Sequence, residues 1–191
     1  MGTAIAIDLR GASFSETIDA AKASQDWAWV SLYELIARPL IGFFRARGAA
    51  DAADLTGDVF FDVARSISRF SGDESEFRTF VFTIAIRRLE ESLAGPAHRR
   101  SVLADDVLAR LKSGLSPVPD DEDQLIPTAV RDGFAALSPE QRQILSLRIA
   151  AGLSLQETAT VVERKVRHVT NIQRRAVHKL QLLGIDAGGS K

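Results

Sequence analysis

Residues 137–183 read LSPEQRQILSLRIAAGLSLQETATVVERKVRHVTNIQRRAVHKLQLL, and two helix starts of the same form stand in this stretch. Ser138-Pro139-Glu140-Gln141 and Ser154-Leu155-Gln156-Glu157 each place a serine three residues before a side chain that can reach back to it. This is the pattern of a capping box, and a proline suits the first helical position. Gly152 is typical of a helix end, expected here near Ala151. The stretch therefore predicts two capped helices in succession, the second of them short.

A longer helix should follow, beginning near Lys165 or Val166 and ending before Gly184. At about 100° per residue, its apolar residues fall on one side and should pack on the preceding helices. A short capped helix, a tight turn and a longer basic helix are the components of a helix-turn-helix. The residues expected on the packed side are Val169, Ile172, Ala176, Leu180 and Leu183.

The opposite side of this helix is basic, and no acidic residue occurs between Arg164 and Leu180. A helix face that is merely solvated usually mixes lysine with glutamate, so the composition disfavours that alternative. Arginine and asparagine can bond base edges in the major groove, and further arginines can bond phosphates and fix the register. We therefore predict DNA binding by this helix. The residues predicted to take part are Arg164, Arg167, His168, Thr170, Asn171, Arg174, Arg175 and His178.

The N-terminal half also reads as helices. Apolar residues recur at spacings of three and four from Trp29 to Phe44, from Leu55 to Phe70 and from Phe77 to Leu89. Pro39 is expected to kink or break the first of these helices. No stretch shows sustained alternation of apolar and polar residues, so no sheet is expected. The predicted fold class is all-α.

Proline, glycine and an acidic run separate the two helical blocks. The stretch from Ser113 to Pro119 leads into four acidic residues at 120–123, which together are typical of a flexible linker. Residues 102–111 are a candidate for one more short helix. We predict two small helical domains joined by this linker, the second a helix-turn-helix domain. The expected boundaries are an N-terminal extension at 1–26, a first domain at 27–100, a linker at 101–127, a second domain at 128–185 and a tail at 186–191.

Composition narrows the classes of function. The chain has 191 residues, no cysteine and three histidines. This excludes a disulfide framework and argues against a metal site, and no cofactor is expected. The net charge of −1 is distributed unevenly over three segments. Residues 1–95 have 10 basic and 14 acidic side chains, residues 96–127 have 4 basic and 6 acidic ones, and residues 128–191 have 10 basic and 5 acidic ones. A basic C-terminal segment on a near-neutral chain suggests that one part of the chain binds an anion and another part binds a different partner.

Neither secretion, membrane insertion nor catalysis is expected. Asp8 and Arg10 interrupt the short apolar start, so no signal peptide fits, and no apolar run is long enough to span a bilayer. We therefore expect a cytoplasmic protein with no membrane partner. The acid pairs Asp105-Asp106 and Glu90-Glu91 are adjacent in sequence and cannot face one pocket from a helix. No glycine-rich phosphate loop or GxSxG occurs, and no catalytic residue is predicted.

Five segments, in order, resemble the extracytoplasmic-function sigma factors of bacterial RNA polymerase. Residues 51–60, DAADLTGDVF, resemble the DAEDLTQEVF segment of that family. Phe70-Ser71-Gly72 and residues 77–85 resemble its FxG and FRxWLxxIA segments. Residues 137–142 and 152–157 resemble its LSPEER and GLSYEEIA segments. The resemblance covers roughly residues 27–183 and implies two helical domains joined by a linker.

The resemblance also implies a function and its partners. The chain would direct core RNA polymerase to promoters and help to open them. Its first domain would bind the clamp of the largest subunit and the minus-ten element, and its second domain the minus-thirty-five element. The acidic run at 120–123 would serve as plain linker or thread the RNA exit path. Whether an anti-sigma factor binds the chain is left open.

Particular residues follow from this resemblance. The implied polymerase-binding residues are Asp54, Leu55, Asp58, Val59 and Phe60. Arg87 and Arg88 lie on the implied promoter-opening helix, and we expect them to be exposed, with Phe77, Phe80 and Ile84 in the core.

The chain departs from the family pattern at several positions. The family usually has tryptophan where Phe80 stands and an arginine-asparagine pair where Ile86-Arg87 stands, and its basic pair after this helix is displaced to Arg99-Arg100. Glu163 replaces the usual glycine of the helix-turn-helix turn, so either the turn differs or the last helix starts at a shifted angle.

A second hypothesis remains beside the sigma factor. A conventional helix-turn-helix regulator with an N-terminal interaction domain would have the same basic helix. Such a regulator binds duplex DNA unaided, often as a dimer, whereas a sigma factor is expected to need core polymerase for firm promoter binding.

Overall fold

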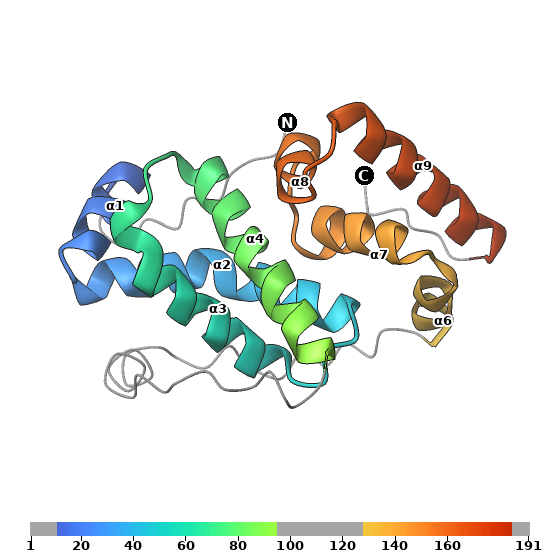
Figure 1. Cartoon of the computed structure of the whole chain (residues 1–191), viewed down its shortest axis with the longest axis horizontal. Coiled ribbons are helices and arrows are strands. Elements are labelled where there is room, and N and C mark those ends of the chain that lie inside the picture. Colours follow the sequence, from blue (N-terminus) through green and yellow to red (C-terminus); the bar gives the residue numbers. More distant parts are fainter. Residues whose placement is uncertain (1–10, 95–127, 185–191) are drawn as a thin grey trace. The chain divides into compact units, whose positions relative to one another are not determined.

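The computed structural model describes residues 11–94 and 128–184, with side chains described from residue 132 onward in the second range. Within these ranges every regular element is a helix and there is no strand, as the sequence predicts. The chain divides into two compact units, Met1–Val118 and Pro119–Lys191 (Figure 1). The predicted linker at 101–127 and the candidate helix at 102–111 lie outside the described residues.

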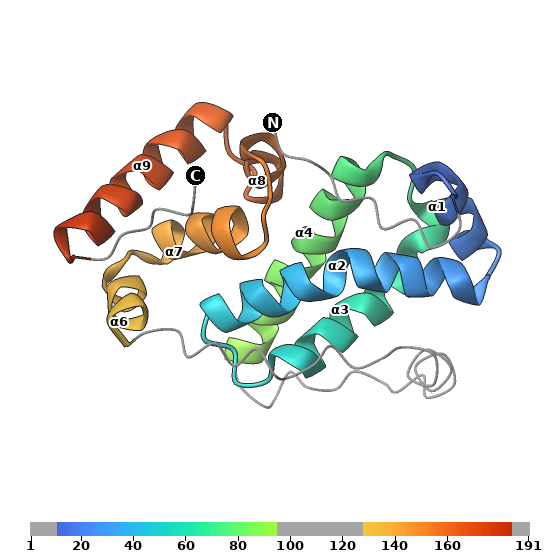
Figure 2. The same ribbon diagram turned by 180° about the vertical axis from the view of Figure 1, so that it is seen from behind.

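The first unit is built on three long helices. These are α2 (Asp26–Ala46), α3 (Ala52–Ser66) and α4 (Glu74–Leu93), with the 3-10 turn η1 (Ile67–Arg69) after α3. All three pack against one another, and Figure 2 shows α2 running along α3 and α4. The predicted apolar stripes meet between them. Phe43, Phe44, Phe77 and Phe82 are the largest fully buried side chains of this core.

The N-terminal extension contributes a helix of its own to this unit. Helix α1 (Phe14–Lys22) begins at a capping box formed by Ser13 and Glu16 and packs against α2 and η1. Ile18 and Ala21 are buried, and the ring of Phe14 lies 5.6 Å from that of Phe77. Residues 14–22 of the predicted extension are therefore part of the first unit.

Pro39 does not break α2, which runs continuously from Asp26 to Ala46. A proline inside a helix costs about 3 kcal/mol. Leu32, Ile36, Leu40 and Phe43, on both sides of it, are at most 1% exposed. Burying each such side chain contributes about 1.5–3 kcal/mol, so packing outweighs the cost and the predicted break is wrong.

The second unit contains the predicted helix-turn-helix. Its elements are α6 (Thr128–Ala136), α7 (Pro139–Leu145), the π-helical segment η3 (Ser146–Ala150), α8 (Leu155–Val161) and α9 (Val166–Leu182). Both predicted capping boxes form, because Ser138 accepts a hydrogen bond from Gln141 N at 3.2 Å and Ser154 accepts one from Glu157 N at 3.1 Å. Gly152 has a φ of 66°, as a helix end requires.

Helix α9 is held by two small cores. Ala176 and Leu180 pack with Leu137 and Leu145, on the side of α6 and α7. The other core joins Val169 and Ile172 to Ile144 of α7 and Ala159 of α8. The predicted packed side is therefore confirmed except at its end, since Leu183 follows the last helical residue and is 52% exposed.

The turn between α8 and α9 keeps the conformation of a glycine turn without a glycine. Glu163 has a φ of 52°. Its N–H donates to Thr160 O at 3.1 Å, and the N–H of Arg164 donates to Ala159 O at 2.9 Å. These are the two bonds of a Schellman motif, with Glu163 in the position that glycine usually takes. The turn is therefore retained, at the expense of a left-handed backbone that disfavours side chains with a Cβ.

Replacing Glu163 by glycine is expected to stabilise the second unit. A non-glycine residue in the left-handed region costs about 1–2 kcal/mol, and part of the gain is lost to the greater freedom of glycine in the unfolded chain. We expect Glu163→Gly to raise the free energy of unfolding by about 0.5–1 kcal/mol. Chemical denaturation followed by circular dichroism measures it. Glu163→Ala keeps the Cβ and is the matched control, and a Gly variant no more stable than the Ala variant would contradict the account.

Candidate nucleic-acid interface

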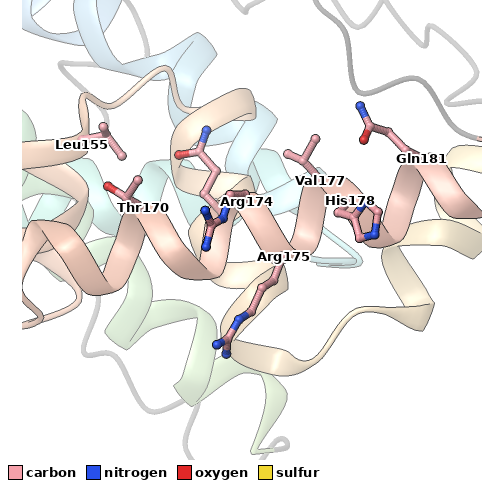
Figure 3. A pocket seen from close by; sticks show the side chains of 8 residues that line it. Leu155, Thr170, Arg174, Arg175, Val177, His178 and Gln181 are labelled. Atoms are coloured by element: carbon pink, nitrogen blue, oxygen red, sulfur yellow. The ribbon is translucent and has the colours of Figure 1, made fainter.

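The outer side of α9 carries most of the predicted DNA-binding residues at the surface. Arg164, in the preceding turn, is exposed, and so are the residues of α9 at 167, 170, 174, 175 and 178, whereas Asn171 is half-buried. Figure 3 shows Thr170, Arg174, Arg175 and His178 projecting from this helix. A shallow hollow lies along this helix. It is lined by side chains of α9 between Thr170 and Gln181 and by Leu155 of α8. The predicted arrangement of a cationic face opposite a packed stripe is present.

Two polar contacts fix α9 from behind. Arg148 of η3 donates from Nε to Gln173 Oε1 at 3.1 Å and from Nη1 to the carbonyl of Leu153. At the far end of the helix, Lys179 Nζ donates to Ala136 O at 2.7 Å. Both cations therefore connect α9 to other elements of the second unit.

His168 differs from the prediction. Its Nε2 lies 2.9 Å from Glu140 Oε1, which joins the first turn of α9 to the first turn of α7. Both side chains are about half exposed, at 45% and 48%. The imidazole therefore makes an internal contact, and the structure does not present it as a free DNA-binding group.

Helix α3 exposes acids and buries the apolar residues of the predicted polymerase-binding set. Asp54 and Asp58 are exposed, but Leu55, Val59 and Phe60 are 9%, 0% and 3% exposed. The reason is helical spacing, since positions 55 and 59 are one turn apart and share one buried side of α3. The ring of Phe60 lies edge-on to Trp29 and Tyr33 of α2, at 5.7 and 5.2 Å. The interpretation of these three as partner-binding residues is therefore corrected to core residues.

On the acidic face of α3, the ionised form of Asp58 is destabilised. Partial burial raises the pKa of this carboxyl above its ordinary value of 3.8. Asp54, Asp62 and Glu91 raise it further by repulsion, and the positive charge of Arg88 opposes them. An ionised Asp58 is therefore less favourable in the folded protein than in the unfolded chain.

Arg87 and Arg88 are both tied to one carboxylate. Arg87 Nη2 lies 2.9 Å from Asp62 Oδ2, and Arg88 donates to the same oxygen from Nε at 2.7 Å. The hydrogen bond to Asp62 raises the pKa of Arg88 above its ordinary value. The side chain of Arg87 is 59% exposed, as predicted, but that of Arg88 is only 17% exposed, so the prediction of an exposed Arg88 is wrong.

A second hollow, which the sequence did not predict, lies in the first unit beside these arginines. Phe80 of α4 and Phe70 of the loop before it lie at its surface, with ring centroids 5.6 Å apart. Phe77 and Ile84 are buried as expected, whereas Phe80 is only partly buried. The signals that could have found this site are the aromatic Phe70 and two arginines four residues apart. The charged residues that line it are Asp62, Arg65, Arg69 and Arg87.

The described residues contain neither a helix that could cross a membrane nor a cluster of metal-binding side chains. None of the helices in residues 11–94 and 128–184 combines the length and apolar character that a bilayer crossing requires. The same part of the chain brings together no group of three or more histidine or acidic side chains that could hold a metal ion.

Comparison with known proteins assigns both units to one family. Residues 32–95 match Sigma-70 region 2, and residues 133–182 match Sigma-70, region 4. The chain is 29% identical over 185 residues to the ECF RNA polymerase sigma factor BldN of Streptomyces coelicolor, covering 95% of this chain and 70% of that protein. It is 24% identical over 135 residues to the ECF RNA polymerase sigma factor SigD of Mycobacterium tuberculosis, covering 71% of this chain and 64% of SigD.

A solved structure shares the fold. CnrH, in a complex with the cytosolic domain of CnrY, superposes with a TM-score of 0.62 at 22% identity, covering 87% of this chain and 94% of that one. Two family regions in the right order, on an all-helical chain with an exposed cationic helix, define a sigma-70 type transcription factor. The chain belongs to the extracytoplasmic-function sigma factors of the sigma-70 family. Its function is promoter-specific initiation of transcription with core RNA polymerase, which decides between the two hypotheses that the sequence left open.

The raised pKa of Asp58 predicts a gain in stability when its charge is removed. A carboxyl whose pKa is higher in the folded state keeps its proton to higher pH there, so stability falls as the pH rises from 3.8 through that raised value. Asp58→Asn should therefore unfold at a higher denaturant concentration than wild type at pH 7, with the difference shrinking toward pH 4. Glu34→Gln on α2 controls for the change in net charge. A less stable Asp58→Asn at pH 7 would contradict this prediction.

Proposed function

We propose that the second unit, residues 128–185, reads the minus-thirty-five element with α9, and that the first unit binds the polymerase clamp and the minus-ten element. The observation that carries the proposal is the outer face of α9, which is cationic, exposed and without an acidic residue from Arg164 to Leu180. We place the first unit at residues 27–100 with α1 added to it, the linker at 101–127, and a tail at 186–191.

Within α9, position along the helix separates two roles. In a helix-turn-helix, the N-terminal part of the second helix contacts base edges. Arg167, Thr170, Asn171 and Arg174 stand there one turn apart, so we assign them to base contacts. The residues left for phosphate contacts, which position the protein without reading sequence, are Arg164, Arg175 and His178.

In the first unit, we assign the clamp contact to the acids of α3. Asp54 and Asp58 are exposed, while the apolar side of the same helix is used in the core. Partial burial is the main reason that an ionised Asp58 is unfavourable, and repulsion from neighbouring acids adds to it, so a basic partner surface would offset part of this cost. An acidic face of this kind favours a cationic partner over nucleic acid.

We assign capture of the opened strand to the hollow beside α4. Opening DNA requires unstacked bases to be caught, and aromatic side chains contribute about 1–3 kcal/mol per stacked base. Phe70 and Phe80 supply rings at the surface, and Arg65, Arg69 and Arg87 supply positive charge for the backbone. The hollow therefore fits a single-stranded nucleotide of the minus-ten element.

The remaining partners follow from this role. Sigma factors are generally regulators without enzymatic activity, and we propose that this chain acts by binding alone, with the polymerase supplying the catalysis. It would then work in the cytoplasm, where polymerase and DNA meet. CnrH was solved with the cytosolic domain of CnrY, and we propose that an anti-sigma partner sequesters this chain in a similar way.

Binding to a promoter selected from a random pool by the reconstituted holoenzyme tests the proposal. The chain alone should shift this DNA weakly, and addition of core polymerase should produce a firm complex. Arg174→Ala should weaken the holoenzyme complex by about 1–3 kcal/mol, or roughly 5- to 150-fold, because one base contact is lost. Lys179→Ala removes the same charge from a side chain that faces Ala136, and it should leave promoter affinity near wild type. Equal losses in both variants, or firm binding without core, would overturn the assignment.

A further inference from the structure

Asp62 stands between the two helices that we assign to polymerase and promoter. It lies in the last two turns of α3 and is 9% exposed, one of the few charged side chains in the core of the first unit. Its Oδ2 accepts hydrogen bonds from two consecutive arginines of α4, Arg87 Nη2 at 2.9 Å and Arg88 Nε at 2.7 Å. A buried carboxylate that loses its cationic partners is strongly destabilising. The contact with Asp62 therefore restricts the side chains of both arginines.

The two arginines differ in what they can still reach. Arg88 is 17% exposed and donates also to Glu91 Oε2 at 3.2 Å, so little of its guanidinium is accessible to a partner. Arg87 is 59% exposed and lines the hollow that contains Phe70 and Phe80. Arg87 Nε also lies 3.9 Å from Glu91 Oε1, which is an ion pair longer than a hydrogen bond. A guanidinium has five N–H donors, so the hydrogen bond to Asp62 leaves donors on Arg87 for a further partner.

We propose that Asp62 is a positioning residue for promoter opening. It holds the guanidinium of Arg87 at the hollow, whereas its bond to Arg88 stabilises the packing of α3 on α4. The inference rests on the function proposed for that hollow. A free arginine side chain would lose rotamer entropy when it binds a strand, and a side chain already held in place loses less. Asp62 thus holds the guanidinium of Arg87 in its binding position before DNA binds.

This arrangement bears on a departure of the chain from the family pattern. Where the family usually has an arginine-asparagine pair, this chain has Ile86-Arg87, with Ile86 half-buried. The exposed cation of this part of α4 is therefore Arg87, one residue later, and the carboxylate that orients it comes from α3. The alternative is that Asp62 only ties α3 to α4 through Arg88.

Double-variant measurements on the reconstituted holoenzyme separate these possibilities. The rate of promoter opening is followed by fluorescence of 2-aminopurine placed in the opened region, and the thermal midpoint of the free chain is measured beside it. We expect Arg87→Gln to slow opening about 10-fold with little change in midpoint. Asp62→Asn should slow opening by a similar factor and lower the midpoint, while Arg88→Gln should mainly lower the midpoint.

The decisive comparison is Asp62→Asn in the Arg87→Gln background. If Asp62 acts through Arg87, the second substitution slows opening less than 2-fold further. If it slows opening by the same factor as in wild type, the positioning role is overturned while the role of Arg87 stands. If Arg87→Gln itself opens the promoter at the wild-type rate, the function proposed for the hollow fails first.

Two further variants complete the design. Should Asp62→Asn fail to fold, Asp62→Glu keeps the charge but displaces the carboxylate by one methylene. It should slow opening more than 2-fold in the wild-type background and not in the Arg87→Gln background, and a wild-type rate for Asp62→Glu would overturn the proposal. Lys22→Gln on α1 removes one exposed cation outside the hollow, and it should leave the opening rate unchanged.

Discussion

Burial of one apolar side of α9 decides which of its charged residues reach the surface. Val169, Ile172, Ala176 and Leu180 are at most 9% exposed, and they occupy the cores that hold α7 and α8 in place. Because helical spacing is fixed, burying these four turns the arginines of the same helix outward. The exposed cationic surface of α9 is therefore a consequence of packing. The same constraint acts on α3, where the apolar residues are buried and the acids Asp54 and Asp58 are exposed.

Local signals in the sequence were sufficient for much of this architecture. The two serine capping boxes, Gly152 and the apolar periodicity of α9 predicted the helix-turn-helix to within a residue or two, because each depends on neighbours in the chain. What the sequence could not predict depends on contacts between distant segments. The bonds from Asp62 to Arg87 and Arg88 span about 25 residues, and Phe80 was assigned to the core although it lines a hollow with Phe70. Pro39 does not end α2, because the packing on both sides of it outweighs its local propensity.

The negative charge of Asp58 in the first unit is unfavourable to folding. Partial burial and repulsion from neighbouring acids raise the pKa of Asp58, so its ionised form is less favourable in the folded chain than in the unfolded one. Glu163 in the second unit is also unfavourable to folding, since it has a left-handed backbone in the turn between α8 and α9. Asp62 differs from both, because its two arginines satisfy it and connect the acidic face of α3 with the hollow beside α4.

Run-off transcription with purified core polymerase tests the central claim most directly. The template carries a promoter selected by the holoenzyme, and a second template carries the same promoter with its minus-thirty-five element scrambled. The account predicts a discrete transcript from the first template only when the chain is added, and a much weaker one from the second. No added transcript over core alone, or equal transcription from both templates, would contradict it.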